Sequence, residues 1–401
     1  MMTYHPLSEK EAIEIARGIP NLFGRSTDLH CREIGDGNLN LVFHITEPTT
    51  GNSIILKQAL PYAKVVGESW PLSLDRARIE SEALQEEGRL APGLVPRVYR
   101  YDPELALTVM EDLSDHIIMR RGLIEGNRYP LFSGHIAMFL ANTLFYTSDL
   151  GRNQQEKKVL SGQYINPDLC KITEDLIFDH PYTDADTNNF NPELRPEVEA
   201  IWNDQTLHLE VAELREGFLI RGQALLHGDL HTGSIFVKAD STKVIDPEFA
   251  YFGPMGFDVG AVIANLLLNF AGQEGWKADA FDRASYREWL LTTIDEVWTG
   301  FEREFRSLWN RDAVDRMART PGYQDRYIQR LLQDTFGYAG CKMIRRVIGL
   351  SHVADIDQIP DSKAKLTAER IALSIGRTLI LHHRKAESIR EVLEIARKTV
   401  S

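Results

Sequence analysis

The loop around Asp229 has the residue types of a site that activates a hydroxyl group. Residues 226–236 place His227, Gly228 and Asp229 directly before a short apolar segment. A carboxylate in such a loop can accept a hydroxyl proton or orient the attacking oxygen. We expect structural roles for His227 and His231, because a loop interrupted by glycine does not hold them at helical geometry and Mg²⁺ prefers oxygen ligands.

A second group of acidic residues follows a little further along the chain. Asp246 and Glu248 flank Pro247 after the apolar residues Val244 and Ile245. Two carboxylates at this spacing, with a rigid proline between them, can both reach one Mg²⁺ site. Taken alone, Asp-Pro-Glu is most often an exposed turn and His-Gly-Asp is most often a polar loop. The presence of both, in this order, makes coincidence improbable.

A lysine and a glutamate in the first part of the chain could hold phosphate groups. Lys57 ends the apolar run 54–57, which has the form of the Val-Ala-Ile-Lys pattern that pairs with α- and β-phosphates. Strands that end in an exposed lysine are common, so this assignment depends on a partner. Glu80, on a helix predicted from Leu74 to Gly88, is the expected partner, and an ion pair would hold Lys57 in place.

A glycine-rich segment precedes the first predicted strand. Residues 35–42 are Gly-Asp-Gly-Asn-Leu-Asn-Leu-Val. Two glycines allow a backbone turn to lie over phosphates with its N–H groups directed at the oxygens. Asn40 stands where the protein-kinase loop has a third glycine, and we expect it to contact nucleotide near the loop tip. In isolation, a tight hairpin explains this segment equally well.

The elements that must position these residues change in character near residue 112. Before it, a capping box at 8–11 opens a short helix, Ser73 or Asp75 can cap a second one, and strands are predicted at 39–46, 53–57, 97–101 and 105–110. After it, loop and short strands over 225–246 interrupt amphipathic helices near 130–147, 193–222, 284–309, 325–350 and 366–399. We therefore predict an α+β chain with an N-terminal antiparallel-sheet lobe at 1–112 and a larger helical C-terminal lobe at 113–401.

Composition excludes several classes of partner. The formal net charge is -13 and no long Lys/Arg block occurs, which argues against a nucleic acid or an anionic membrane surface. The longest apolar-rich run, near 259–272, is shorter than the roughly 18 residues of a membrane span. The three cysteines are far apart and predict neither a zinc site nor a disulfide framework. The N-terminus has no apolar stretch of signal-peptide type, so we expect a cytoplasmic protein.

The order of these motifs resembles the branch of the kinase superfamily that contains aminoglycoside phosphotransferases and choline kinases. Longer segments sharpen this to a resemblance with the bacterial methylthioribose kinase family, and they lie at 35–43, 62–72, 227–234, 245–249 and 344–346. The resemblance implies a protein-kinase-like two-lobed fold with ATP and Mg²⁺ in the cleft. It also implies transfer of the γ-phosphoryl group to the anomeric 1-hydroxyl of 5-methylthioribose, in methionine salvage, by a homodimer.

The same resemblance implies roles for residues that no local pattern identifies. Backbone groups of Glu111, Asp112 and Leu113, where the lobes should join, are expected to bind adenine, and their side chains can be solvated. Trp70 is expected either in a lid over the site or as a core anchor of its loop. At least one member of the tandem pair Arg345–Arg346 is expected to enter the cleft and hold the phosphoryl group or the ribose hydroxyls, Arg345 being favoured. The alternative is that one arginine is a surface ion-pair partner and the other is partly buried against a carboxylate.

Two positions depart from the general kinase pattern. Ser234 stands where an asparagine would hold a second metal ion, and Glu248 replaces the glycine of Asp-Phe-Gly. We interpret Glu248 as supplying the ligand that Ser234 lacks.

Two other functions remain open from the sequence. A kinase of an aminoglycoside or amino-alcohol would act on a cationic acceptor and would have further carboxylates in its cleft. A nucleotide-binding pseudokinase is the non-enzymatic alternative. The presence of Lys57, Asp229, Asp246 and Glu248 argues against it.

Overall fold

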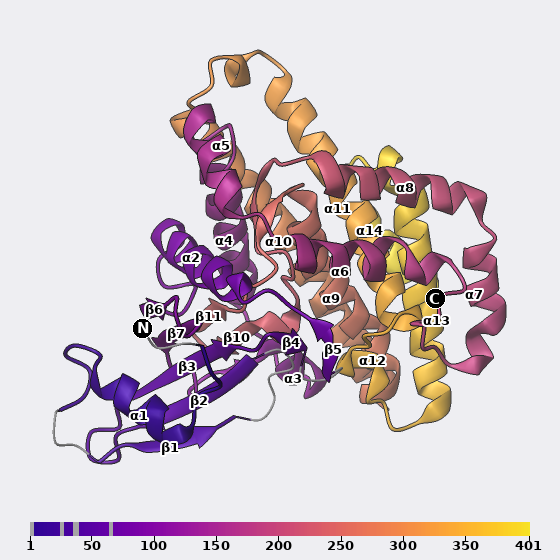
Figure 1. Ribbon diagram of the computed structural model, residues 1–401. Coiled ribbons are helices and arrows are strands. Elements are labelled where there is room, and N and C mark those ends of the chain that lie inside the picture. The colour runs from indigo at the N-terminus through magenta and orange to yellow at the C-terminus, as the bar shows by residue number, and fades with distance from the viewer. Residues whose placement is uncertain (1–3, 25–27, 35–39, 64–66) are drawn as a thin grey trace.

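A sheet-based part and a helical part follow one another along the chain (Figure 1). The computed structural model describes residues 4–24, 28–34, 40–63 and 67–401. The strands are β1 (His30–Glu33), β2 (Asn40–Thr46), β3 (Ser53–Ala59), β4 (Tyr62–Ala63), β5 (Gly67–Pro71), β6 (Val98–Asp102), β7 (Leu107–Glu111), β8 (Ile117–Ile118), β9 (Ala224–Leu226), β10 (Ile235–Lys238), β11 (Ser241–Val244) and β12 (Tyr251–Gly253).

The helices are concentrated after residue 118. The α-helices are α1 (Glu9–Arg17), α2 (Asp75–Leu90), α3 (Met119–Ile124), α4 (Phe132–Tyr146), α5 (Gln154–Gln163), α6 (Pro167–Phe178), α7 (Arg195–Trp202), α8 (Gln205–Ile220), α9 (Gly256–Trp276), α10 (Ala280–Asp312), α11 (Tyr323–Ile348), α12 (Ala354–Asp357), α13 (Ser362–His382) and α14 (Arg390–Val400). Short 3₁₀ turns are η1 (His180–Tyr182), η2 (Pro192–Leu194), η3 (Thr232–Ser234), η4 (Met317–Arg319) and η5 (His383–Lys385). These elements confirm the predicted α+β class.

The N-terminal sheet has the strand order β1-β2-β3-β7-β6, with antiparallel neighbours throughout. On β3, Ile54 and Leu56 are buried together with residues of β2, β7 and α1. Because side chains alternate along a strand, Lys57 points to the opposite face from these two residues. One face of the sheet is thus covered by α1, whose predicted capping box is present at Ser8 and Glu11, and the other face presents Lys57.

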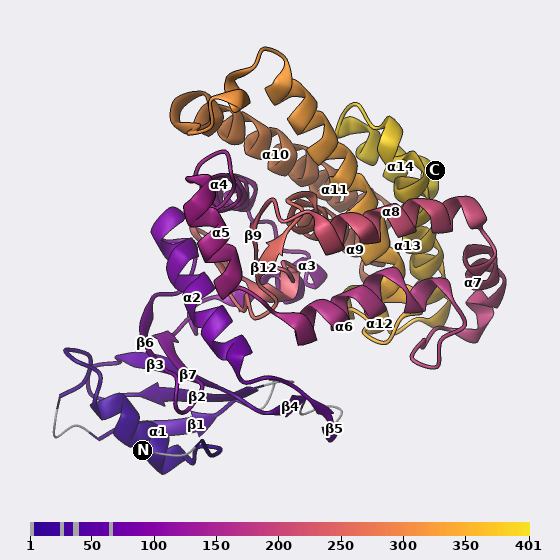
Figure 2. The same cartoon turned by 45° about the horizontal axis from the view of Figure 1, so that its top comes forward.

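The helix α2 connects this sheet to the helical part. Leu84 belongs to the large core formed by the helical part, and Ile79 and Ala83 pack with Leu225 and other residues that follow residue 160. In Figures 1 and 2, α2 lies between the sheet and the helices. The N-cap position is Leu74, which makes no side-chain capping bond, and the Ser73 hydroxyl, one residue earlier, accepts from the N–H of Asp75 (3.2 Å).

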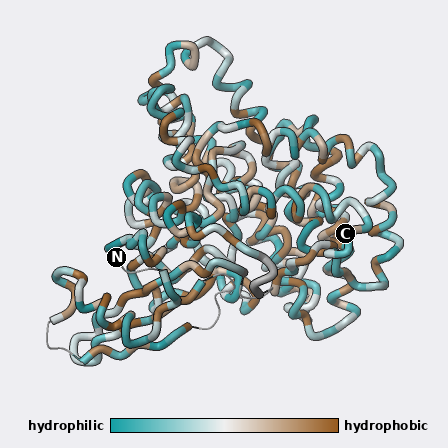
Figure 3. The backbone as a smooth tube through the Cα atoms, in the orientation of Figure 1, coloured by the Kyte–Doolittle hydropathy of each residue, from teal (hydrophilic) through white to brown (hydrophobic). Residues whose placement is uncertain are grey.

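The helical part is built around α9. This helix is buried along most of its length and packs against α10, α11, α12 and α13. Figure 3 shows hydrophobic segments running through the strands and the central helices, with hydrophilic turns outside. A Cβ at Gly340 would lie 2.5 Å from the carbonyl oxygen of Gly376, so the glycines of α11 are packing sites, as predicted.

Two predicted helices are broken. The predicted helix 193–222 is divided into α7 and α8, because Asp204 caps a new helix by accepting from the N–H of Leu207 (3.0 Å). The predicted helix 366–399 is divided into α13 and α14, with η5 between them. Among the helices of the described residues, none has the length and apolar character needed to cross a membrane. The lobe boundary at residues 112 and 113 stays a prediction.

Candidate active site

The loop that follows β9 is pinned by a buried carboxylate at the start of α9. Asp258 accepts hydrogen bonds from the backbone N–H groups of His227 (2.7 Å) and Gly228 (3.1 Å). Gly228 has φ 84, and a Cβ there would lie 2.2 Å from the carbonyl oxygen of Phe249. Only glycine fits this turn without displacing its neighbours. The position of Asp229 is therefore fixed by residues on both sides of the loop.

The two histidines of the loop have structural partners. His227 Nε2 lies 2.8 Å from the carbonyl oxygen of Ile245, and since a carbonyl only accepts, Nε2 carries the proton. Its Nδ1 accepts from the N–H of Asp229 (3.3 Å). His231 Nδ1 is 3.1 Å from the Ser234 hydroxyl, which donates to the Asp229 carbonyl (3.3 Å). His227 thus connects the Asp229 loop to the segment that carries Asp246.

Asp229 lies in a strongly cationic environment. Its carboxylate is 27% exposed and lies 3.4 Å from Nε2 of His231. Burial alone would raise the pKa of Asp229, but His231, Arg346 and Lys342 outweigh burial, and the pKa lies well below its ordinary value. Asp229 is therefore ionised at neutral pH, so both of its oxygens can accept a hydrogen bond from a hydroxyl.

Lys57 meets two carboxylates on the face of the sheet opposite α1. Its Nζ lies 2.7 Å from Oε1 of Glu80, on α2, and also contacts Oδ1 of Asp246. Burial disfavours the charge on Lys57, but Asp246, Glu80 and Glu248 outweigh this effect and raise its pKa. Burial would likewise raise the pKa of Asp246, but Lys57 lowers it below its usual range. The structure thus brings Lys57 and Glu80 together as an ion pair.

The residues around Asp246 offer a set of oxygens that suits a hard cation. Ligand oxygens of Glu80, Asp246 and Glu248 lie within 4.8 Å of one another. Asp246 has φ 71, a left-handed backbone that is rare for a residue other than glycine and that is common at functional sites. Glu248 is 5% exposed, and its Oε2 has no hydrogen-bond partner. Burial and the neighbouring Asp246 raise the pKa of Glu248 to about 7. A carboxylate oxygen without a hydrogen-bond donor, in a group of three carboxylates, fits Mg²⁺.

Two buried residues hold the Glu248 segment. Arg76 Nε, on α2, lies 3.8 Å from Oε2 of Glu248, and its Nη2 donates to the carbonyl of Leu60 (2.9 Å). Asn166 Nδ2 donates to the backbone carbonyl oxygens of Glu248 (2.8 Å) and Ala250 (3.2 Å). The predicted roles of Asp246, Pro247 and Glu248 stay predictions, and these contacts explain how the segment is held in one conformation.

The predicted adenine-binding segment lies at the end of β7. Asp112 is not simply solvated: its Oδ2 accepts from Ser53 Oγ (2.6 Å) and lies 3.0 Å from His44 Nε2. The Glu111 carboxylate accepts from the N–H of Arg97 (2.9 Å) and from Lys243 Nζ (3.3 Å). The expectation that these side chains are solvated is therefore wrong, because they hold neighbouring strands. Adenine binding by the backbone of this segment, including Leu113, stays a prediction.

The glycine-rich segment and the predicted lid residue Trp70 are only partly described. Residues 35–39 of the glycine-rich segment lie outside the described residues. Asn40 is the first residue of β2 and is 6% exposed. Trp70 lies on β5, which pairs with β4, and its side chain is outside the description. Their contacts with ligands stay predictions.

The tandem arginines end α11, near Asp229. Both are half-buried, and Arg346 Nη1 donates to the carbonyl of Ser351 (3.2 Å). Burial lowers the pKa of Arg345 and of Arg346, and the Asp229 carboxylate opposes this effect for both. Lys342, one turn earlier, has its Nζ 3.6 Å from the ring centroid of Phe257. Burial and the charges of Arg345 and Arg346 lower the pKa of Lys342 to about 7. The carboxylates of Asp229 and Asp258 act in the opposite direction but do not outweigh them.

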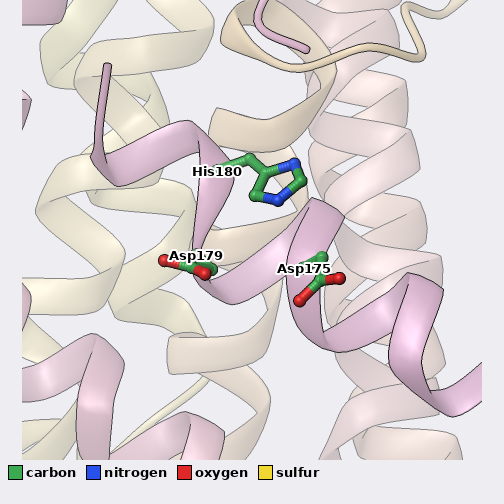
Figure 4. A group of neighbouring side chains, drawn as sticks. All are labelled: Asp175, Asp179 and His180. Carbon is green, nitrogen blue, oxygen red and sulfur yellow. The ribbon is translucent and has the colours of Figure 1, made fainter. Parts of the chain in front are cut away.

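Two other features lie apart from this site. Asp175, Asp179 and His180 come from the end of α6 and the turn after it (Figure 4). Asp175 pairs with Lys171, and His180 Nδ1 lies 2.7 Å from the Thr187 hydroxyl, so this group already has protein partners. A cavity of about 540 Å³ is lined by residues that include Asn191, Leu350, His352, Lys365 and Glu369. None of the predicted site residues lines it.

Sequence reasoning missed four residues that the structure places at the site. They are Arg76, Arg120, Asp258 and Lys342. Asp258 had a readable signal, since a carboxylate at the start of a long apolar helix needs a partner. The other three occur in ordinary helical patterns and had none.

Loss of the Asp258 carboxylate is expected to weaken both folding and turnover. Asp258→Ala leaves two buried N–H groups without an acceptor, which should lower the free energy of unfolding by about 2 kcal/mol or more. Urea unfolding and kcat below the transition would measure this. Asp361→Ala is the control, because Asp361 accepts from a backbone N–H (2.7 Å) at the start of α13, and there kcat should not change. Wild-type stability and kcat in Asp258→Ala would contradict the anchoring role.

Comparison with known proteins identifies the family. Residues 30–291 match the model of the phosphotransferase enzyme family. The methylthioribose kinase of Geobacillus kaustophilus (strain HTA426) is 54% identical over 382 residues, covering 95% of this chain and 94% of that protein. That of Geobacillus sp. (strain WCH70) is 52% identical, covering 99% and 97%. That of Bacillus cereus (strain 03BB102) is 48% identical, covering 100% and 99%. The chain therefore belongs to the methylthioribose kinase family, within the phosphotransferase enzymes.

Proposed function

We propose that the chain transfers the γ-phosphoryl group of ATP to the anomeric 1-hydroxyl of 5-methylthioribose, giving 5-methylthioribose 1-phosphate and ADP for methionine salvage. The observation that carries the proposal is an ionised carboxylate, Asp229, beside the cations of α11. Through His227, its loop is joined to the segment that carries Asp246, which contacts Lys57. The names of the full-length relatives support the acceptor.

Different charged residues would bind the phosphates and the metal ion. Lys57 would bind the α- and β-phosphates once its present carboxylate contacts are exchanged for phosphate oxygens. Asp246 and Glu248 would hold Mg²⁺, which neutralises charge on the phosphates when bound. The acceptor oxygen forms a bond to phosphorus while the bond to the β-phosphate oxygen breaks.

Asp229 is suited to orienting the acceptor hydroxyl. A carboxylate with a lowered pKa is a weak base, so it would accept a hydrogen bond from the hydroxyl and receive the proton only late in the transfer. This agrees with phosphoryl transfers that gain most of their rate from positioning.

The predicted role of the tandem arginines Arg345 and Arg346 can be tested by substitution. If Arg345 or Arg346 holds the phosphoryl group, its change to lysine should lower kcat by about tenfold or more, because the charge survives but the forked geometry is lost. Steady-state kinetics with methylthioribose would measure this. Arg330→Lys is the control, because Arg330 is on the same helix but packs over the Tyr327 ring and is not one of the cations near Asp229. If both Arg345→Lys and Arg346→Lys keep the wild-type kcat and KM, the pair is structural.

The charges around Asp229 disfavour the amino-alcohol and aminoglycoside alternative. Lys342, Arg345 and Arg346 surround this carboxylate, and they would repel a cationic acceptor. The pseudokinase alternative predicts nucleotide binding without turnover.

An ADP-release assay over a panel of acceptors would decide between these functions. The panel contains methylthioribose, ribose, choline, ethanolamine and an aminoglycoside. We expect methylthioribose to give the highest kcat/KM. ADP release with only the cationic acceptors, or with none, would overturn the proposal.

We also propose a cytoplasmic homodimer. The implied metabolic role supports this location, and fractionation of the source cells would test it. The oligomeric state would be measured by light scattering during size-exclusion chromatography, where a monomeric mass at working concentration would contradict the dimer.

A further inference from the structure

Arg120, on α3, is held beside the Asp229 loop by buried acceptors. Its Nε lies 3.0 Å from Oδ2 of Asp355, and its Nη2 donates to Oδ1 of Asn265 (3.0 Å). The side chain of Arg120 is 17% exposed and that of Asp355 is 1% exposed. One guanidinium nitrogen therefore donates a hydrogen bond to α9, and a second lies at ion-pair distance from α12.

A chain of buried polar groups on α9 fixes Asp355 in turn. Asn269 Nδ2 donates to Oδ1 of Asp355 (2.8 Å), and Gln273 Nε2 donates to Oδ1 of Asn269 (2.8 Å). Trp276 Nε1 donates to the backbone carbonyl of Asp355 (2.7 Å). Ordering an arginine costs side-chain entropy, and burying a carboxylate costs solvation. Such support is expected where a guanidinium must be aimed at a ligand.

The third nitrogen, Nη1, lies against the Asp229 loop. A Cβ at Gly233 would be 2.7 Å from Nη1 of Arg120 and 2.9 Å from Cε1 of His231. The absence of a side chain at Gly233 therefore provides the room that both groups occupy. His231 Nε2 is 3.4 Å from Oδ2 of Asp229. His231 thus lies near both Arg120 and the Asp229 carboxylate.

Arg120 adds to a group of cations that protein carboxylates only partly balance. Burial lowers the pKa of His231, Arg345 and Arg346, and the charge of Arg120 adds to this effect for all three. Three carboxylates oppose these cations: Asp229 acts on Arg345, Arg346 and Lys342, Asp258 acts on Lys342, and Asp355, which pairs with Arg120, acts on Arg346. An uncharged sugar offers them no anion, whereas a phosphoryl group does, and a guanidinium matches two of its oxygens.

We infer that Arg120, positioned by Asp355, binds the transferred phosphoryl group on the acceptor side of the site, both during transfer and in the phosphorylated product. Together with the tandem arginines it would form a three-guanidinium anion site. The inference rests on the proposed phosphoryl transfer at Asp229, but it does not depend on which hydroxyl compound is the acceptor. The competing explanation is that the Arg120–Asp355 pair only ties α3 to α12.

Phosphate binding separates these explanations without requiring turnover. The variants are Arg120→Gln, Arg120→Lys and Asp355→Asn, and the control is Arg287→Gln. Arg287 forms a similar pair with Glu274 (3.0 Å) and donates to the carbonyl of Phe270 (3.0 Å). Both partners are on α9, but Arg287 is not one of the cations near Asp229. Calorimetry would measure the affinity for inorganic phosphate and for the product made by the wild-type enzyme, with melting temperatures recorded in parallel.

We expect Arg120→Gln to weaken phosphate and product binding by about tenfold or more and to lower kcat by a similar factor. KM for ATP should stay within about twofold of the wild type. Arg120→Lys should lose less affinity than Arg120→Gln, because the charge remains. Asp355→Asn should also weaken phosphate binding, whereas Arg287→Gln should lower the melting temperature and leave phosphate affinity unchanged.

Wild-type phosphate affinity in both Arg120 variants would overturn the inference and leave the pair a structural tie. If Arg120→Gln does not fold, the comparison of Arg120→Lys with the wild type decides the matter. A wild-type enzyme that phosphorylates another acceptor, but whose phosphate affinity depends on Arg120, would refute the proposed acceptor and support this inference.

Discussion

Asp229→Asn is expected to lower kcat by at least about 10²-fold while the affinity for ATP changes little. Asparagine keeps the size of the side chain but loses the negative charge that, in the proposed function, would hold the acceptor hydroxyl. The charge is ordinarily secured by His231, Arg346 and Lys342, which lower the pKa of Asp229. Under the proposed function, nucleotide binding would depend on Lys57 and Asp246 instead, so it should survive. Steady-state kinetics and nucleotide calorimetry would measure the two effects separately.

The control for this prediction is Asp240→Asn, because Asp240 is exposed in the turn between β10 and β11. Its kcat should equal that of the wild type. Turnover by Asp229→Asn within a few-fold of the wild type would show that another group orients the acceptor.

Asp246→Asn is expected to lower kcat by about 10²-fold or more and to raise the Mg²⁺ concentration that gives half-maximal rate. The variant removes an anionic oxygen from the group formed with Glu80 and Glu248. It also removes a carboxylate partner of Lys57. Glu248→Gln should raise the Mg²⁺ requirement as well, because Oε2 of Glu248 has no hydrogen-bond partner and is the best candidate ligand after Asp246. Kinetics over a Mg²⁺ series and direct Mn²⁺ binding would measure both changes.

Asp179→Asn provides a matched control, because Asp179 belongs to the other group of acidic and imidazole ligands, at the end of α6. It should change neither the Mg²⁺ requirement nor Mn²⁺ binding at the site. If Glu248→Gln has the wild-type requirement, Glu248 does not replace the ligand missing at Ser234.

The sequence predicted those parts of the site whose residues are held by local patterns. Lys57 follows from a strand with alternating burial, and its pairing with Glu80 follows from the helix after that strand. The loop at Asp229 could be predicted for a similar reason, because glycine and charged residues stand together at the end of a short strand.

The rest could not be predicted because it depends on contacts between distant segments. Arg120 and Asp355 meet only after α3, α9 and α12 have packed together, and neither residue is unusual in its own helix. Asp112 was expected in solvent because its partners, His44 and Ser53, lie on strands whose side chains have no local signature. The division between α7 and α8 had a local signal in Asp204, but the amphipathic pattern on both sides obscured it.

The position of α2 has a mechanical consequence for the site. This helix packs against both parts, because Leu84 lies in the helical core and Ala77 packs with Ala59 of β3. Lys57 belongs to the sheet, whereas Asp246 belongs to the helical part. A hinge motion between the two parts would therefore separate Lys57 from Asp246. Phosphate oxygens could replace the Asp246 carboxylate, so nucleotide binding would remove a contact that holds the two parts together.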